Sequence, residues 1–303
     1  MIEADRLTRR YGEFVAVSDI SFKIERGEIV GLLGHNGAGK TTIMKMLTGF
    51  LEPSAGCVRV DGVEVERDPL TVQARLGYLP ESLPFYPELT VSGFLEYTAQ
   101  IRGVDAQRAV SQAIARTELE EKALEPISTL SRGFKQRLGV AQAILHEPQF
   151  LIMDEPTNGL DPTQTQHMRE LIKRLSASAT VILSTHIMQE VNAICDRVLI
   201  LKDGGLALDE RLEDIVMSNQ LQVRTKPEAN LPEALEGITT FSNITRLENG
   251  NWSIDVDGDR KLAAEQVAVR MVNAGLPVYE LSAVQRDLEA VFKEVNEGIE
   301  NAA

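Results

Sequence analysis

A short loop has glycines and a lysine spaced to enclose a phosphate. The segment GLLGHNGAGKTT contains the pattern Gly-x-x-x-x-Gly-Lys-Thr from Gly34 to Thr41. Glycines let a backbone curl until its N–H groups surround a phosphate. Lys40 adds positive charge for the terminal phosphates, and the Thr41 hydroxyl is a suitable Mg²⁺ ligand. The pattern predicts nucleotide binding by the loop residues Gly34, His35, Asn36, Gly37, Ala38, Gly39, Lys40, Thr41 and Thr42.

Two carboxylates follow an apolar run later in the chain. In FLIMDEP, Asp154 and Glu155 come directly after four apolar residues. Ligands of open α/β sheets lie at the carboxyl ends of strands. Asp154 is therefore a candidate to hold Mg²⁺ through water, and Glu155 is a candidate to polarise a water for attack on a γ-phosphate. Taken alone, the segment could equally be a strand before an acidic turn, but the phosphate loop favours the catalytic interpretation.

A second segment also has the chemistry of an anion site. LSRGFKQR, residues 130–137, places Ser131, Arg132 and Gly133 where a helix is expected to begin. A helix start presents free backbone N–H groups, and a serine hydroxyl can join them. One chain thus carries two candidate phosphate-binding segments, which raises the question of whose phosphate the second one binds.

Strands must alternate with helices to position these segments. Apolar runs predict buried strands at 28–34, 149–156, 180–186 and 197–204, and an alternating run predicts another at 14–27. Such alternation indicates an α/β fold with a mostly parallel sheet flanked by helices.

A helical insertion interrupts this pattern. Residues 84–146 are largely helical in character, with Thr90 and Ser131 as capping candidates. We expect them to form a helical subdomain within a nucleotide-binding domain over 1–216.

The pattern changes near residue 217. Residues 217–303 show the order β-α-β-β-α-β of a small ferredoxin-like α+β domain, and a further helix is expected at 286–297. Trp252 lies on an alternating strand and is expected in the core rather than in a ligand site. This part has no catalytic constellation, so we expect an accessory domain that supports dimerisation or regulation.

Composition narrows the classes of partner. The chain has 303 residues, 43% hydrophobic and 25% charged, and a net charge of −14. That charge disfavours a nucleic-acid surface and electrostatic attachment to anionic lipid, so we expect no nucleic acid and no direct lipid anchor. No apolar run approaches the roughly 20 residues that span a bilayer, and the N-terminal segment has no signal-peptide core. Cys57 and Cys195 are expected to be reduced thiols of a cytosolic protein.

Taken together, the motifs resemble those of the ATP-binding subunits of ABC transporters, over about residues 2–215. The phosphate loop, LSRGF, FLIMDE, NGLD and STH occur in that family's order. The resemblance implies the P-loop ABC ATPase fold, with an antiparallel β-subdomain beside the parallel sheet, and ATP and Mg²⁺ as ligands. It also places Tyr11, in LTRRYG, where the family stacks an aromatic ring on adenine.

The resemblance further implies a homodimer. In this family two subunits meet head to tail, and the signature loop of each closes over ATP on the other. By that likeness, Ser131, Arg132 and Gly133 contact the partner's ATP, and Asp161 of NGLD links the two sites. His186 of STH then contacts the γ-phosphate and organises the attacking water. The implied function is ATP hydrolysis that powers a separate integral membrane permease, with the subunit peripheral on the cytoplasmic face.

Two residues depart from the family pattern. Arg132 stands where glycine is usual, and it either adds a phosphate contact or points to solvent or a polar network. Glu81, in GYLPES, replaces the usual glutamine, and it remains a candidate Mg²⁺ ligand although it adds negative charge. Both features are similar to the gliding-motility and multidrug ATP-binding subunits, and LEAVFKEV (288–295) resembles the tail of ABC-2 export subunits. Export is therefore favoured, while the cargo stays open.

The segment SLPFYPELTV, after Glu81, has two interpretations. Its side chains Leu83, Phe85, Tyr86 and Leu89 either receive a helix of the membrane subunit, as in the family, or pack the helical subdomain.

Two other functions of a nucleotide-binding protein compete with transport. A soluble mechanical ATPase of the same fold would act on ribosomes or DNA, but such proteins commonly carry two cassettes or a long coiled coil, and this chain has one cassette. A nucleotide sensor without turnover is disfavoured by the intact Glu155 and His186.

Overall fold

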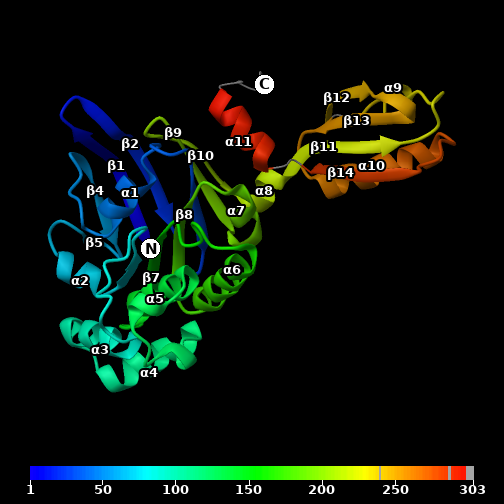
Figure 1. Ribbon diagram of the computed structural model, residues 1–303. Coiled ribbons are helices and arrows are strands. Elements are labelled where there is room, and N and C mark those ends of the chain that lie inside the picture. Colours follow the sequence, from blue (N-terminus) through cyan, green and yellow to red (C-terminus); the bar gives the residue numbers. More distant parts are fainter. Residues whose placement is uncertain (239, 286–287, 298–303) are drawn as a thin grey trace. The chain divides into compact units, whose positions relative to one another are not determined.

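The chain folds into two units (Figure 1). The computed structural model describes residues 1–238, 240–285 and 288–297. One unit comprises Met1–Leu212 with Glu294–Ala303, and the other comprises Glu213–Lys293. The last residues of the accessory domain predicted over 217–303 lie outside the described residues.

A six-stranded sheet forms the centre of the first unit, in the order β10-β9-β3-β8-β7-β6. Five strands are parallel and β10 runs antiparallel to β9, which confirms the mostly parallel sheet. The carboxyl ends of the parallel strands therefore meet at one edge. The strands are β3 (Ile29–Leu33), β6 (Leu76–Leu79), β7 (Phe150–Asp154), β8 (Thr180–Thr185), β9 (Arg197–Lys202) and β10 (Gly205–Arg211).

A smaller antiparallel sheet, β2-β1-β4-β5, accompanies the central one, as the ABC resemblance implied. Its strands are β1 (Ile2–Tyr11), β2 (Phe14–Ile24), β4 (Ala55–Val60) and β5 (Val63–Glu64). The sequence pattern did not predict β1, because the register of this strand against β2 shifts at Ala4, Leu7 and Arg9. These shifts break the alternation of buried and exposed residues. The first three residues of GYLPES belong to a strand, β6, which pairs with β7.

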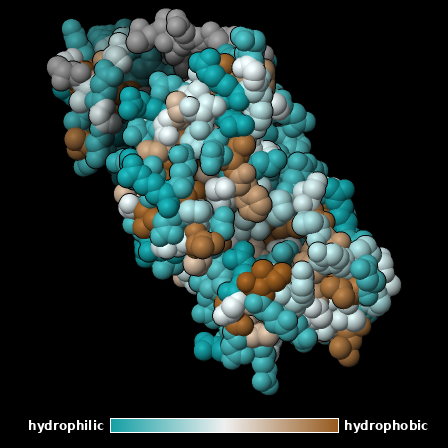
Figure 2. Space-filling view, turned by 90° about the vertical axis from the view of Figure 1, so that its left-hand side faces the viewer, coloured by the Kyte–Doolittle hydropathy of each residue, from teal (hydrophilic) through white to brown (hydrophobic). Residues whose placement is uncertain are grey.

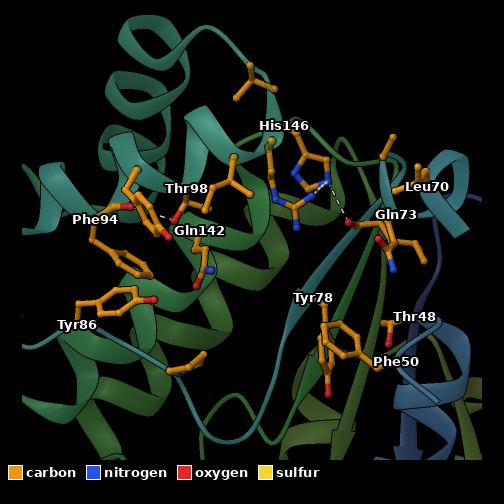
Figure 3. Close-up of a pocket in the computed structure, with 17 residues that line it drawn as sticks. Thr48, Phe50, Leu70, Gln73, Tyr78, Tyr86, Phe94, Thr98, Gln142 and His146 are labelled. Carbon is orange, nitrogen blue, oxygen red and sulfur yellow. Dashed lines mark hydrogen bonds between the residues drawn. The ribbon is translucent and has the colours of Figure 1, made fainter.

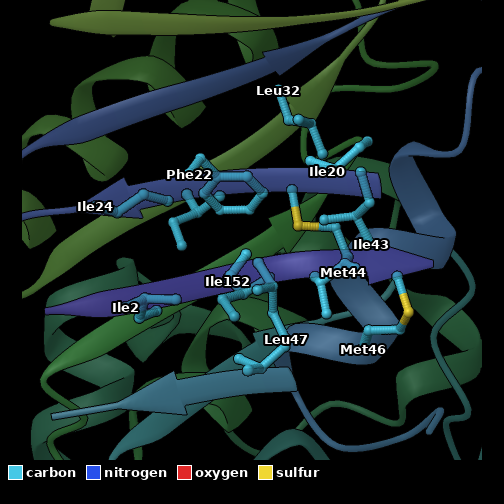
Figure 4. Close-up of a cluster of buried hydrophobic side chains, with 14 of the residues drawn as sticks. Ile2, Ile20, Phe22, Ile24, Leu32, Ile43, Met44, Met46, Leu47 and Ile152 are labelled. Carbon is cyan, nitrogen blue, oxygen red and sulfur yellow. The ribbon is translucent and has the colours of Figure 1, made fainter. Parts of the chain in front are cut away.

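Helix α1 (Lys40–Leu47) lies between the two sheets and fills the main core. Figure 4 shows its Ile43, Met44 and Leu47 among strand residues such as Ile20 and Ile152. These side chains are at most 1% exposed, and burying each stabilises the fold by roughly 1.5–3 kcal/mol. The phosphate loop is thus held between two buried, well-packed elements, β3 and α1.

The predicted helical segment contains three full helices. They are α3 (Val91–Arg102), α4 (Ala106–Thr117) and α5 (Arg132–Ile144). The hydroxyl of Thr90 accepts from the Gly93 N–H at 3.1 Å, and that of Ser131 accepts from the Phe134 N–H at 3.4 Å, so both predicted caps are in place. The remaining helices of this unit are α2 (Pro69–Gln73), α6 (Pro162–Ser176) and α7 (Met188–Ile194).

The second unit has the predicted β-α-β-β-α-β order in a four-stranded antiparallel sheet, β12-β13-β11-β14. Trp252, on β13, is 5% exposed and belongs to this unit's core, as expected. The elements are β11 (Met217–Arg224), α9 (Leu231–Ala234), β12 (Phe241–Arg246), β13 (Asn251–Val256), α10 (Arg260–Asn273) and β14 (Glu280–Gln285). Two further helices flank these elements in the sequence, α8 (Leu212–Val216) and α11 (Leu288–Glu297).

Candidate active site

The loop between β3 and α1 needs its glycines for backbone reasons. Gly37 and Gly39 have φ of 85° and 103°, in the left-handed region that other residues avoid. A Cβ on Gly39 would also lie 2.8 Å from the carbonyl oxygen of Ala16 on β2. His35, Asn36 and Gly37 are exposed on the rim of the loop, and Thr41 and Thr42 are half-buried in the first turn of α1.

Lys40 reaches back across the loop. Its Nζ donates to the carbonyl oxygens of Gly34 at 2.7 Å and His35 at 3.2 Å. It also lies 3.7 Å from Glu155 Oε1, although the two residues are 115 positions apart in the sequence, and Lys40 is only 6% exposed. The structure therefore brings the phosphate loop and the predicted general base to the same end of the sheet.

Glu155 turns away from β7 in a left-handed backbone conformation, with φ of 50°. Such a conformation costs a non-glycine residue about 1–2 kcal/mol and is common at functional sites. The Glu155 N–H donates to Ser184 Oγ at 3.0 Å, at the end of β8. Oε2 and Oε1 of Glu155 lie 3.0 and 3.2 Å from Nδ1 of His186. Because a carboxylate only accepts hydrogen bonds, Nδ1 is the donor. Glu155 is nearly buried while the His186 side chain is 44% exposed, so the histidine faces the open side.

Asp154 has the features of a metal-binding carboxylate. It is fully buried, and its Oδ1 accepts from the Ser184 hydroxyl. Within the described part of the chain, its Oδ2 has no hydrogen-bond partner, which is costly for a buried oxygen. A hard cation beside Thr41 would satisfy that oxygen, so the residues fit Mg²⁺. Glu81 is exposed, and its Oε1 accepts from the Asn158 amide at 3.4 Å.

The signature segment packs against the NGLD segment of its own chain. A Cβ on Gly159 would collide with the guanidinium of Arg132, and one on Gly133 would collide with the side chain of Gln164. The structure places the Arg132 guanidinium against the NGLD backbone at Gly159, and a phosphate contact by Arg132 stays a prediction. Asp161 caps α6 by accepting from the Gln164 N–H at 2.9 Å.

Tyr11 lies at the β1–β2 turn, where its side chain is accessible. It is 47% exposed, and the guanidinium carbon of Arg9 lies 4.7 Å from its ring centre. Stacking of this ring on adenine remains a prediction.

The sequence did not predict a buried polar network that lies beside Glu155 and His186. Glu190, on α7, is 1% exposed and accepts hydrogen bonds from the hydroxyls of Thr157 and Thr185. Ser184 was likewise missed, although it joins Asp154 to the backbone of Glu155. The one available signal was its position at the end of a buried strand, beside the histidine.

Comparisons with known proteins address the same region. A family model described as ABC transporter matches residues 17–158. The chain is 36% identical over 222 residues to the bacitracin transport ATP-binding protein BcrA of Enterococcus faecalis, covering 73% of this chain and 72% of that protein. It is 30% identical over 295 residues to the uncharacterized ABC transporter ATP-binding protein YdbJ of Bacillus subtilis (strain 168), covering 96% and 94% of the two.

A solved structure supports the fold. It is a dimeric post-hydrolysis state of the ATP-binding cassette MJ0796 bound to ADP and Pi, with a TM-score of 0.64 and 24% identity, covering 70% of this chain and 99% of that one. The relatives and the family model extend the likeness from fold to sequence family. The resemblance stated from the motifs is therefore confirmed: the chain belongs to the ATP-binding subunits of ABC transporters and is an ATPase of that family.

Proposed function

We propose that this subunit hydrolyses ATP in a head-to-tail homodimer and thereby powers a membrane permease that exports its cargo. The observation that carries the proposal is the convergence at one sheet edge, where Glu155 lies 3.7 Å from Lys40 and 3.0 Å from His186. A carboxylate between a phosphate-binding lysine and a partly exposed imidazole is placed to polarise a water at the γ-phosphate.

Each group has a defined role in this proposal. The loop N–H groups and Lys40 bind the β- and γ-phosphates, and Tyr11 stacks on the base. Glu155 acts as the general base, and its bond to His186 Nδ1 orients the imidazole toward the γ-phosphate. Asp154, Thr41 and Glu81 would hold Mg²⁺, which neutralises charge on the phosphate oxygens when bound.

A second copy completes the site. Ser131, Arg132 and Gly133 stand at the start of α5, where free N–H groups and a helix dipole favour an anion. The side chains of Ser131 and Arg132 are exposed. The first phosphate loop covers one side of ATP, so the signature segment of a partner covers the other, and Asp161 lies at the junction.

Light scattering of the Glu155→Gln variant tests this dimer. Without the general base, ATP stays intact, so the variant should convert from monomer to dimer when Mg-ATP is added. The Glu155→Gln, Lys40→Ala double variant is the control, because it lacks the phosphate-binding charge and should stay monomeric. A Glu155→Gln chain that stays monomeric in saturating Mg-ATP would exclude the sandwich.

A groove in the helical segment supports the permease as a partner. Apolar side chains gather over this segment in the lower part of the space-filling view (Figure 2). The groove has a volume of about 840 Å³ and is lined by α3 and the end of α5 on one side and by α2, β6 and the residues after α1 on the other. Figure 3 shows Phe94, Tyr86, Tyr78 and Phe50 around it. An apolar groove of this size accommodates one face of an amphipathic helix.

The SLPFYPELTV segment contributes to both the groove and the packing. Leu83 packs on α5, because a Cβ on Gly139 would lie 2.7 Å from it. The ring of Phe85 meets that of Phe94 edge-on, with centres 5.2 Å apart. Tyr86 is 47% exposed and lines the groove, so it is the side chain of this segment best placed for a permease helix.

Capture from membranes tests the permease. Among the described residues, no helix has the length and apolarity to cross a bilayer. We therefore expect a partner to hold the chain on the cytoplasmic face. Glu155→Gln protein, incubated with detergent-solubilised host membranes and Mg-ATP, should retain a multi-spanning protein in stoichiometric amount. Ile101→Arg, in the groove, should abolish retention, whereas Leu124→Arg, exposed outside it, should not. Equal retention by both variants would place the permease elsewhere.

A further inference from the structure

We propose that Glu190 is a positioning residue that ties the segment after Glu155 to the segment around His186. Its buried carboxylate would hold the general base, the histidine and the NGLD segment in one arrangement. The inference deepens the proposed function and rests on the roles given there to Glu155 and His186.

The two oxygens of Glu190 serve two different segments. Oε1 accepts from the hydroxyl of Thr157, in the turn after β7, and Oε2 accepts from that of Thr185 at 2.8 Å, at the end of β8. Removing a carboxylate from water costs several kcal/mol unless its oxygens are bonded. At 1% exposure, Glu190 therefore depends on these two hydroxyls, and each hydroxyl is fixed in return.

Thr185 transmits this bond to the histidine. Its hydroxyl donates to Glu190 and accepts from the N–H of Ile187 at 3.1 Å. The residues immediately before and after His186 are thus held by one hydroxyl. This fixes the backbone from which the imidazole reaches Glu155.

Thr157 transmits the other bond to the NGLD segment. Its carbonyl oxygen accepts from the Leu160 N–H at 3.1 Å, and the Asn158 N–H donates to the carbonyl oxygen of Glu155 at 3.1 Å. These two backbone hydrogen bonds close the turn from Glu155 toward Asp161. The hydrogen bond from the Thr157 hydroxyl to Glu190 attaches this turn to α7. A displacement of NGLD in a dimer would act on His186 through Glu190.

A double-mutant cycle on the two threonines tests the connection. Thr157→Val and Thr185→Val each remove one hydroxyl at nearly constant volume. We expect each to lower kcat about tenfold, and the double variant to lose about tenfold to thirtyfold rather than the hundredfold of independent sites. KM for ATP should change by less than about twofold, because the phosphate loop is untouched. Thr157→Ser and Thr185→Ser, which keep the hydroxyl, should restore kcat.

Thr117→Val is the matched control. Thr117 is also fully buried, and its hydroxyl donates to the Ala113 carbonyl oxygen at 2.7 Å within α4. This variant should lower Tm as much as the other valine variants do while kcat stays at the wild-type value. Equal kcat losses in all three valine variants would reduce the effect to general stability and overturn the proposal.

The failure of this inference can be distinguished from the failure of the function on which it rests. Losses that multiply to about a hundredfold, or valine variants at positions 157 and 185 with wild-type kcat, would overturn the role of Glu190 alone. A Glu155→Gln chain that hydrolyses ATP at the wild-type rate would instead overturn the assignment of the general base.

Discussion

The two candidate anion-binding segments of this chain differ in how much of each is completed within one copy. In the phosphate loop, Lys40 is buried, and its Nζ is bonded to loop carbonyls and lies near Glu155. In the signature segment, Ser131 caps its own helix and Arg132 rests on the NGLD backbone, with both side chains exposed.

This difference indicates which of the two segments makes turnover depend on a second copy of the chain. A loop whose groups are fixed before binding needs little reorganisation when a phosphate arrives. The start of α5 contacts NGLD and Gln164 of its own chain, but the side chains of Ser131 and Arg132 stay exposed, so we expect its contribution to depend on what docks against it. We therefore expect the first segment to govern nucleotide binding and the second to govern turnover of the dimer.

The sharpest way to break this comparison is to place one defect in each segment. Lys40→Ala should reduce phosphate release by at least about a thousandfold, since it removes the charge from the phosphate site. Ser131→Ala should reduce it about tenfold to a hundredfold. Thr90→Ala is the control for the lost cap, because it costs about 1 kcal/mol of stability in the same helical segment and should leave turnover intact.

Mixing the two defective chains then distinguishes a site in trans from one in cis. Half of the randomly formed dimers are mixed, and each holds one site that combines an intact Lys40 with an intact Ser131. Phosphate release in an equimolar mixture should therefore rise to about a quarter of the wild-type rate. A mixture no more active than the average of its two components would show that the segments do not meet across a dimer.

A smaller effect, on stability, compares how strictly each segment requires its glycine. Gly39→Ala should lower the free energy of unfolding by about 2–3 kcal/mol, because its φ of 103° and the nearby Ala16 carbonyl both oppose a Cβ. Gly133→Ala should cost less than about 1 kcal/mol, since the obstructing group is the flexible end of Gln164. Urea unfolding of both variants checks the order, and equal losses would remove this distinction between the segments.

The last effect appears only at acidic pH and concerns His146, which lies just beyond the end of α5 and lines the groove. Burial, helped by the charge of Arg102, lowers the pKa of His146 to about 4, against an ordinary value near 6.5. The unfolded chain therefore binds the proton more readily, so stability is intact above pH 6.5 and falls as pH drops toward 4.

Comparing the wild type with His146→Gln isolates this contribution. After allowance for partial exposure, the loss amounts to about 2 kcal/mol. Urea unfolding at pH 7 and pH 4.5 should show a smaller pH-dependent loss in the variant. An identical loss in both proteins would mean that His146 titrates normally in the folded state.

The sequence predicted the mostly parallel fold and placed the candidate site residues on it, but it missed some of the strands around them. A strand, a glycine loop and a helix are contiguous, so the pattern from Gly34 to Thr41 contained its own structural context. β6 has only four residues, which is too short for a periodic signal, and β10 is an edge strand in which no residue is fully buried. Such strands form because they pair with a neighbouring strand, and their own residues carry little strand signal.

Buried polar partners were beyond reach for a related reason. Glu190 looks like any acidic residue of an exposed helix until the ends of β7 and β8 come together around it. Asp154 and Glu155 could be found because they follow an apolar strand, whereas Thr157 and Ser184 owe their roles to neighbours distant in sequence.

Helix α5 has a mechanical consequence. Its 13 residues form a rod of about 20 Å, with the N-cap Ser131 at one end and, at the other, Gln142 and the following His146 in the groove. Arg137, near its middle, is bonded to Glu118 at 2.8 Å, which supplies a pivot. A tilt of about 10° around that pivot would move each end by roughly 2 Å. Binding sites tolerate displacements of only about 0.5 Å, so a segment bound in the groove would move α5 far enough to change the proposed anion site at Ser131.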